Sequence, residues 1–438
     1  MERLLELALR QSQQCEVFEV RSESTRVQFE ANRLKQVERK QSSGVAVRIV
    51  RDGRIGFASA SGDFKPERLI EMAVETSSFG APARLTFPGM QEMPSMKLYD
   101  ERVASLEVAS MIEMGTGVIE SVVGEYEDVQ CEGVVSRSSG TVRIINSSGL
   151  DDSFRQTGLA LFMEGMRVKD TDMLFVGDGA TSCDLLLQSD AIAESMLRQL
   201  ELASRSATIR TGNYPVLFTP LGVGAALLGP LAVAFNGKNV VEKASRLAGR
   251  GGEEVFDTRL SLRDDATIDW RPTSAPFDDE GTRCGRIDLI RNGAVGQFLY
   301  DLQTAAEAGA ESTGSGHRGD SRSQVRPGMS AFVLEEGDTS YEEMLSGIDE
   351  GLVVEELIGA NQGNLLAGDF GGNVLLGYKV EKGEIVGRVK DTMVAGNIMD
   401  VLKSVTAIGS DARWVGGSLR TPSLLCDGVS VSAKRGEA

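Results

Sequence analysis

The first two hundred residues contain the same order of elements twice, and this order most strongly limits the possible fold. The first copy predicts a helix over 2–13, strands at 17–21, 27–30 and 45–50, a hairpin turn at Asp52-Gly53, and a helix that begins at Pro66. The second copy predicts a helix over 105–123, strands at 129–134, 141–145, 158–163 and 173–176, and a helix over 191–202. This repetition predicts an α+β unit with an internal structural duplication. The alternative is that any helix followed by a strand meander looks self-similar at this level.

From about residue 211 onward, short apolar runs are interrupted by glycine, which is typical of closely packed strands. The predicted strands are 214–219, 287–290, 331–334, 364–366, 373–376, 383–389 and 424–431, and the predicted helices are 221–235, 297–310 and 341–345. Asn292-Gly293 and Lys382-Gly383 are predicted turns. We therefore expect an N-terminal α+β domain over 1–205, with a duplicated helix-plus-antiparallel-sheet pattern. A β-rich C-terminal domain over 206–438 follows it, with one buried apolar helix.

The charge of the chain argues against nucleic-acid partners. There are 46 Lys and Arg against 64 Asp and Glu, a net charge of −18, and adjacent basic residues occur only as isolated pairs such as Arg39-Lys40. A nucleic-acid binder needs clustered basic residues. The sequence shows neither a secretory signal nor an apolar stretch long enough to span a membrane. Five scattered cysteines without a CxxC pair indicate reduced thiols, and we expect a cytoplasmic protein without membrane contacts.

The chain contains a single histidine, His317. A catalytic zinc normally takes three protein ligands, and an HExxH motif needs two histidines on one helix. A site built from His317, a distant thiol and a carboxylate is the weaker alternative. Nucleophilic catalysis would need His317 as the only available base, and no GxSxG motif accompanies it. We therefore expect no catalytic residue, no metal ligand and no cofactor-binding residue in this chain.

Three polar or glycine-rich segments need an interpretation. The glycines of 222–229 fit no phosphate-binding motif and indicate close helix packing. Asp278-Asp279-Glu280 could hold a cation or serve an independent hydrolase, but an exposed acidic turn is the preferred interpretation. The loop around His317 is either a binding or pairing loop or a solvated turn. Its candidate peptide-binding or pairing residues are Ser312, Thr313, Gly314 and His317.

An ordered set of motifs in the second half resembles the TldD/PmbA family, once called modulators of DNA gyrase. The motifs lie at 276–281, 289–293, 312–314, 351–354, 368–370, 383–386, 395–397 and 408–411. In this family, members of the TldD type are zinc metallopeptidases with an HExxxH motif on the helix that follows the first strand of the C-terminal domain. The corresponding segment here, 221–235, contains no His, Glu, Asp or Cys. We therefore assign no residue of this chain to the HExxxH motif. We also do not assign the metal-binding thiolate of the family to Cys426.

This departure resembles the second type in the family, the TldE or PmbA subunit, which lacks the metal motif. The resemblance implies a heterodimer with a TldD-like catalytic subunit that degrades unfolded or precursor peptides, with zinc only in that partner. It also implies that a homodimer can form in isolation. Strand edges in the β-rich domain could hold an extended peptide by strand addition. The alternative from another functional class is a homodimeric peptide-binding or scaffold protein without catalytic activity. The charge disfavours modulation of gyrase by direct DNA binding.

Overall fold

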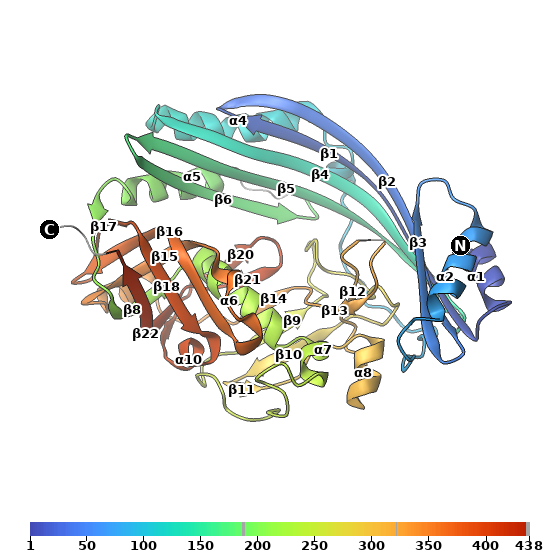
Figure 1. Cartoon of the computed structure of the whole chain (residues 1–438). Helices are drawn as coiled ribbons and strands as arrows, with labels where there is room; N and C mark the ends of the chain where they lie inside the picture. Colours follow the sequence, from blue (N-terminus) through green and yellow to red (C-terminus); the bar gives the residue numbers. More distant parts are fainter. Residues whose placement is uncertain (186–188, 321, 435–438) are drawn as a thin grey trace.

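The computed structural model describes residues 1–185, 189–320 and 322–434. Its N-terminal half is a curved, six-stranded antiparallel sheet in the order β3-β2-β1-β4-β5-β6 (Figure 1). We call this the N-terminal sheet. In chain order, the helices and strands of the N-terminal half are α1 (Glu2–Leu9), β1 (Gln14–Glu30), β2 (Arg33–Arg51), β3 (Arg54–Ser61), α2 (Pro66–Ser77), α3 (Glu101–Ala104), α4 (Val108–Glu125), β4 (Val129–Asn146), β5 (Asp151–Lys169), β6 (Asp172–Ser182) and α5 (Ser189–Leu202).

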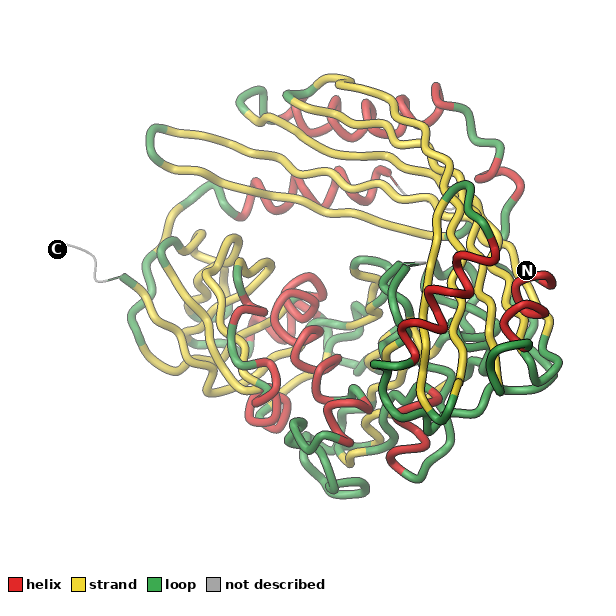
Figure 2. Tube along the Cα trace, turned by 45° about the vertical axis from the view of Figure 1, so that its right-hand side comes forward, coloured by secondary structure: helices red, strands yellow, loops and turns green. Residues whose placement is uncertain are grey.

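The N-terminal sheet consists of two halves with the same order of elements. The first half is α1-β1-β2-β3-α2 and the second is α4-β4-β5-β6-α5. The halves meet at β1 and β4, which pair antiparallel from Glu16 opposite Asn146 to Phe29 opposite Gly133. Figure 2 shows the helices of the two halves towards opposite ends of the arched sheet. The predicted α+β class and the duplicated pattern are confirmed.

The strands are longer than the apolar periodicity predicted. Residues 17–21 and 27–30 belong to one strand, β1, and 129–134 and 141–145 belong to β4. Between the predicted segments lie polar side chains such as Ser22 and Ser24, whose backbone pairs with β2 on one side and β4 on the other. These side chains are not buried, so this part of the strand carries no apolar alternation to reveal it.

Local turn and cap signals were accurate. Asp52 and Gly53 have φ values of 48° and 72°, as the predicted hairpin turn requires, and Pro66 is the first residue of α2. The two predicted turns in the second half, Asn292-Gly293 and Lys382-Gly383, also have positive φ values at both residues.

The C-terminal body contains two large sheets with α6 (Pro220–Ala234) between them, and a separate two-stranded sheet of β12 and β13. The larger sheet has the path β15-β8-β22-β18-β16-β17-β7, and the smaller has the order β11-β10-β9-β14-β21-β20. Side chains of α6 such as Val223, Leu227 and Leu231 share one core with both sheets. The predicted β-rich region with one buried apolar helix is confirmed, whereas its division from the first domain at residue 205 stays a prediction. The strands are β7 (Ser206–Ala207), β8 (Gly212–Phe218), β9 (Leu262–Asp265), β10 (Arg286–Arg291), β11 (Ala294–Val295), β12 (Gly316–His317), β13 (Arg326–Pro327), β14 (Phe332–Leu334), β15 (Glu350–Ile358), β16 (Asp369–Glu381), β17 (Glu384–Val389), β18 (Thr392–Asn397), β19 (Val405–Ile408), β20 (Arg413–Val415), β21 (Leu419–Thr421) and β22 (Leu424–Ala433).

Three element predictions were wrong in detail. The helix predicted over 2–13 ends at Leu9, and the one over 297–310 is only α8 (Leu302–Ala308), because Asp301 caps its start. The strand predicted at 364–366 is replaced by a 3-10 turn, because the Asn364 side chain accepts a hydrogen bond from the Ala367 N–H. The remaining helical elements are α7 (Gly237–Val241), α9 (Tyr341–Ser346), α10 (Ile398–Lys403), η1 (Ala360–Gln362) and η2 (Leu365–Ala367).

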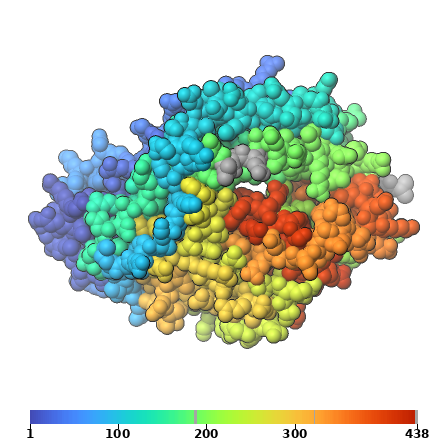
Figure 3. Space-filling view, turned by 180° about the vertical axis from the view of Figure 1, so that it is seen from behind, coloured from blue at the N-terminus to red at the C-terminus, as the bar shows by residue number. Residues whose placement is uncertain are grey.

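Ion pairs hold the N-terminal sheet to the C-terminal body at separate points. Near the β5–β6 hairpin, the carboxylate of Asp172 accepts a hydrogen bond from Arg388 and forms an ion pair with Lys390. Further along β6, Asp178 pairs with Arg413 at 2.8 Å. A space-filling view from behind shows an opening between the sheet and the body (Figure 3).

Across the ranges that the structure describes, no helix combines the length and the apolar character needed to cross a membrane.

Candidate functional site

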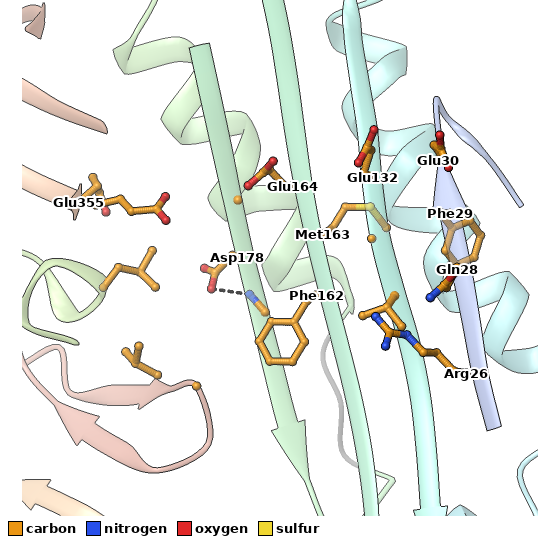
Figure 4. Close-up of a pocket in the computed structure, with 18 of the residues that line it drawn as sticks. Arg26, Gln28, Phe29, Glu30, Glu132, Phe162, Met163, Glu164, Asp178 and Glu355 are labelled. Atoms are coloured by element: carbon orange, nitrogen blue, oxygen red, sulfur yellow. Dashed lines mark hydrogen bonds between the residues drawn. The ribbon is translucent and has the colours of Figure 1, made fainter. Parts of the chain in front are cut away.

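The main candidate site is a cleft of about 660 Å³ between the N-terminal sheet and the C-terminal body. On one side it is lined by α6, β15, β20 and the turn after β20, and on the other by strands β1, β4, β5 and β6 and by Lys35 of β2 (Figure 4). The lining residues used below are Leu221, Ala225, Glu355, Glu356, Arg26, Glu30, Lys35, Glu132, Phe162, Glu164, Asp178 and Gly179.

Helix α6 presents an apolar surface to this cleft. Its less buried positions, 221, 224, 225, 228 and 229, recur at helical spacing, and Leu221 and Ala225 line the cleft. Thr219 caps the helix by accepting from the Gly222 N–H, and its hydroxyl donates to Glu355 at 2.9 Å. The helix therefore fixes one carboxylate at the cleft but carries no acid, base or metal ligand of its own.

The glycines of this helix permit close packing, as the sequence predicted. A Cβ atom added at Gly222 would lie 2.1 Å from the carbonyl oxygen of Val354, and one at Gly229 would lie 2.2 Å from the Asn361 side chain. These distances bring α6 directly against β15 and the turn that follows it.

On the sheet side, side chains from neighbouring strands lie next to each other. Glu132 on β4 is the direct cross-strand partner of Glu164 on β5. One pair further along, the ring of Phe162 covers Gly179 on β6, where an added Cβ would be 2.1 Å from a ring carbon. The ring therefore occupies the space that a side chain at position 179 would fill.

The cleft is acidic. Six carboxylates, those of Glu30, Glu132, Glu164, Asp178, Glu355 and Glu356, line it together with only two basic side chains, Arg26 and Lys35. Lys35 is paired with Glu30, and Asp178 with Arg413. Among the described residues, no ion pair involves Glu132, Glu164 or Glu356, so their charge is not compensated.

Burial raises the pKa values of three of these carboxylates, and neighbouring carboxylates contribute to the shift. Burial and the neighbouring Glu132 raise the pKa of Glu164. Burial, with Glu164 and Glu355 nearby, raises the pKa of Glu356, and burial also raises that of Glu355. A positively charged ligand would lower the cost of ionising all three groups.

The loop that carries the predicted site residues does not line the cleft. Ser312 and Thr313 donate hydrogen bonds to the carbonyl oxygen of Tyr300, and Gly314 has a φ of 67° close to the backbone of Arg283. His317 is half-buried, and its Nε2 lies 3.2 Å from the hydroxyl of Ser330. Burial lowers the pKa of His317. The role of these residues in peptide binding or pairing stays a prediction.

In the acidic triplet 278–280, Asp278 and Glu280 are buried and Asp279 is half-buried, which corrects the preferred interpretation as an exposed turn. Asp278 is 2% exposed and Glu280 is fully buried. The reason is compensation: Arg48 from β2 binds Glu280, and backbone N–H groups of Glu280, Thr282 and Gly316 donate to Asp278. The Arg318 N–H donates to Asp279 at 2.6 Å. Glu280 therefore links the C-terminal body to the N-terminal sheet, and none of the three carboxylates lines the cleft.

The cysteines and the histidine are not gathered into a metal centre in the described part of the chain. No group of three or more His, Cys, Asp or Glu side chains there has an arrangement that could hold a metal ion. All five cysteines are buried and unpaired. Burial raises the pKa of Cys131 and of Cys183 to about 11, so these thiols are not activated.

Comparison with known proteins identifies the class and then the family. Residues 211–433 match the PmbA/TldA metallopeptidase C-terminal domain, and residues 15–77 match PmbA/TldA metallopeptidase domain 1. The fold is thus that of a metallopeptidase-class protein. More specifically, the chain belongs to the PmbA/TldD family, which confirms the resemblance seen in its motifs.

Individual relatives cover nearly the whole chain. The metalloprotease PmbA of Escherichia coli O157:H7 is 26% identical over 93% of this chain and 90% of its own length. A crystal structure described as a modulator of a DNA gyrase from Thermotoga maritima is 26% identical and covers 98% of this chain and 99% of its own, with a TM-score of 0.88. The crystal structure of TldE from Thermococcus kodakarensis covers 99% of this chain and 100% of its own at 23% identity, with a TM-score of 0.90, and shares the fold.

The metal that the description of the family as metallopeptidases implies does not fit the residues of α6. The helix offers Leu, Gly and Ala side chains to the cleft, and zinc takes thiolate, imidazole or carboxylate ligands. We therefore derive no step through a metal bound to this helix.

Sequence reasoning missed the acidic cleft. Its carboxylates come from strands that are far apart in the chain, such as Glu30, Glu164 and Glu355, and only the sheet order brings them together. One feature of the sequence could have indicated it. Successive side chains of a strand point to opposite faces, so Glu132 lies on the face of β4 opposite to the buried Val129 and Cys131.

Proposed function

We propose that this chain is the subunit without a metal site in a two-subunit zinc peptidase that acts on unfolded or precursor peptides. The zinc and the catalytic glutamate belong to a TldD-like partner, and this chain contributes a cleft and an assembly surface. Membership of the PmbA/TldD metallopeptidase family supports the peptidase context. The proposed location is the cytoplasm, since its free thiols suit a reducing compartment.

The observation that carries the proposal is the apolar face of α6 on an acidic cleft. In the metallopeptidase type of the family this helix carries the zinc motif, whereas here Leu221 and Ala225 occupy the cleft side. With a volume of about 660 Å³, the cleft has room for an extended segment of polypeptide but not for a folded domain. Leu221, Ala225 and Phe162 would contact apolar side chains of such a segment.

Mixing experiments test the proposal. The full chain would be purified alone, together with a family member that has the HExxxH motif and comes from the same cell, and with that member carrying Gln in place of its motif Glu. We expect hydrolysis of an unfolded protein such as reduced, alkylated casein in the first mixture and none with this chain alone or in the second mixture. Chelator-sensitive hydrolysis by this chain alone would overturn the proposal.

The alternative is a peptide-binding homodimer without catalysis. It is favoured by the fact that one chain alone forms the cleft. Stable binding of an unfolded peptide, with no gain of hydrolysis on addition of the HExxxH-bearing chain, would support this alternative.

A further inference from the structure

The outer part of β2 forms a sheet edge that has no neighbouring strand on that side among the residues that the structure describes. Strand β3 pairs with β2 only from Gly44 to Arg51, while β1 pairs with β2 along its whole length. From Arg33 to Ser43, every side chain of β2 is exposed. Figure 1 shows this segment along the rim of the N-terminal sheet, away from the C-terminal body. We call residues 33–43 the β2 edge.

An uncovered edge of this length is unusual for a soluble protein. It presents unpaired backbone N–H and C=O groups that can join the strand of another chain. Leu34 and Val37 on this edge are 44% and 42% exposed. Both face the side of the sheet that α4 covers, since their partners Phe29 and Val27 on β1 are buried in the core with α4. A strand added beside β2 would cover these two apolar side chains.

The charge of the β2 edge is opposite to that of the whole chain. It contains four basic residues, Arg33, Lys35, Arg39 and Lys40, and one acidic residue, Glu38, so its net charge is +3, whereas the chain carries −18. Only Lys35 among the four basic residues takes part in an ion pair within the described residues, and its partner is Glu30. The other three positive charges are available to a partner.

This charge pattern argues against pairing with a second copy. Two β2 edges side by side would bring together two segments of net charge +3 in every register. In the antiparallel register centred on Val37, Lys35 of each copy would lie opposite Arg39 of the other. Like charges directly opposite each other destabilise a strand pair.

We infer that the β2 edge is the docking site for an acidic strand of a different chain, which adds to the N-terminal sheet beside β2. The added strand would also extend the cleft, because Lys35 lines both the cleft and the β2 edge. That this different chain is the catalytic subunit rests on the proposed function. The docking site itself does not depend on it.

Direct binding to defined peptides tests the inference. Gln41→Cys in the full chain places one exposed thiol at the end of the edge, and the five native cysteines are buried, so a fluorophore would label this position alone. The probes are an eleven-residue peptide that alternates Glu with Val and Thr, and the same peptide with Lys in place of Glu. We expect saturable binding of the Glu peptide, loss of that binding at high salt, and no binding of the Lys peptide.

A charge-reversal pair locates the binding site. Arg39→Glu with Lys40→Glu should weaken binding of the Glu peptide by about tenfold or more. Arg10→Glu with Arg68→Glu, at exposed positions directly after α1 and on α2, makes the same change in net charge and should leave binding unchanged. Circular dichroism and melting of both variants check that the fold is retained. In the wild-type chain, hydrogen exchange should slow on addition of the Glu peptide within 33–43.

Three results would overturn the inference. They are equal binding of the Glu and Lys peptides, undiminished binding by the Arg39→Glu/Lys40→Glu variant, and absence of binding to the unmutated edge. A wild-type homodimer in light scattering that this variant dissociates would assign the edge to a second copy instead. Peptidase activity of the mixture is measured separately, so failure of the docking site and failure of the proposed function are distinguishable. If the variant mixture is as active as the wild-type mixture, the docked strand does not come from the catalytic subunit, and the proposed function stands.

Discussion

The guanidinium of Arg48 binds the carboxylate of Glu280, which lies 232 positions further along the chain. The same guanidinium donates to Glu16 on the neighbouring strand β1 at 2.7 Å, and Arg318 donates to the other oxygen of Glu16 at 2.7 Å. The four charged groups are buried. One network of alternating charge therefore joins the N-terminal sheet to the C-terminal body, close to the loop that carries His317.

Removing one cation from this network should destabilise the protein strongly. Arg48→Met leaves Glu16 with one cationic partner and Glu280 with none, and an unpaired buried charge costs about 3–5 kcal/mol of the free energy of unfolding. Denaturant unfolding measures the effect. Arg21→Met, at an exposed position on β1, is the matched control and should change stability by less than about 0.5 kcal/mol. Equal stability of the two variants would show that the network does not hold the N-terminal sheet to the C-terminal body.

Asp301 should make stability depend on pH. Burial, with Glu280 nearby, raises the pKa of this carboxyl to about 6 in the folded protein, above its ordinary value near 4. The folded state thus retains a proton that the unfolded state has lost, and the contribution of Asp301 to stability falls as pH rises from about 4 through about 6. Asp301→Asn keeps a capping side chain for α8 but cannot titrate.

Urea titrations check this prediction. They measure the free energy of unfolding of the wild type and of Asp301→Asn at pH 4.5 and at pH 8. The variant should gain relative to the wild type at pH 8 by roughly 2–3 kcal/mol more than at pH 4.5. Parallel pH profiles for the two proteins would contradict the raised pKa.

Two glycine substitutions should have opposite effects. Gly222→Ala on α6 would bring a Cβ atom within 2.1 Å of the Val354 carbonyl oxygen, so α6 must move away from β15. We expect a loss of roughly 1–3 kcal/mol in the free energy of unfolding. Gly124→Ala on α4 meets no atom within 4 Å and should raise stability by roughly 0.5–1 kcal/mol. Melting curves of both variants measure the changes in stability. If Gly222→Ala stabilised the protein, the close contact between α6 and β15 would be disproved.

The acidic lining of the cleft should select peptides with positive charge. Glu132→Gln with Glu164→Gln removes an uncompensated like-charge pair on adjacent strands. The double variant should bind a lysine-rich unfolded peptide several-fold more weakly and a neutral peptide of equal length with unchanged affinity. It should also be more stable by roughly 0.2–1 kcal/mol.

Anisotropy titrations with the two labelled peptides measure this preference. Glu335→Gln with Glu336→Gln, away from the residues that line the cleft, is the charge-matched control. An equal loss for both peptides, or the same loss in the control, would mean that the cleft carboxylates do not select the ligand.

Local signals in the sequence predicted most elements of the fold, and long-range pairing accounts for what was missed. Pro66, Asp52-Gly53 and the apolar run of α6 act within a few residues, so their effects are visible in the sequence. The polar centre of β1 forms a strand only because β2 and β4 lie on either side of it.

The candidate site was harder to predict, because its residues belong to separate elements. Glu280 looks like part of an exposed acidic turn in sequence, and its burial depends on Arg48, which is more than two hundred residues away. The apolar character of α6 could be read directly, whereas the acidic surface opposite it depends on sheet order. The family motifs identified the scaffold, and the tertiary structure located the cleft.

Metal analysis of the separated subunits tests the central claim most directly. This chain and its HExxxH-bearing partner would each be incubated with zinc, dialysed against a weak chelator and analysed by plasma mass spectrometry, before and after assembly. The account predicts zinc well below one equivalent in this chain and close to one equivalent in the partner and in the assembled pair. One tightly held zinc ion per molecule of this chain alone would contradict it.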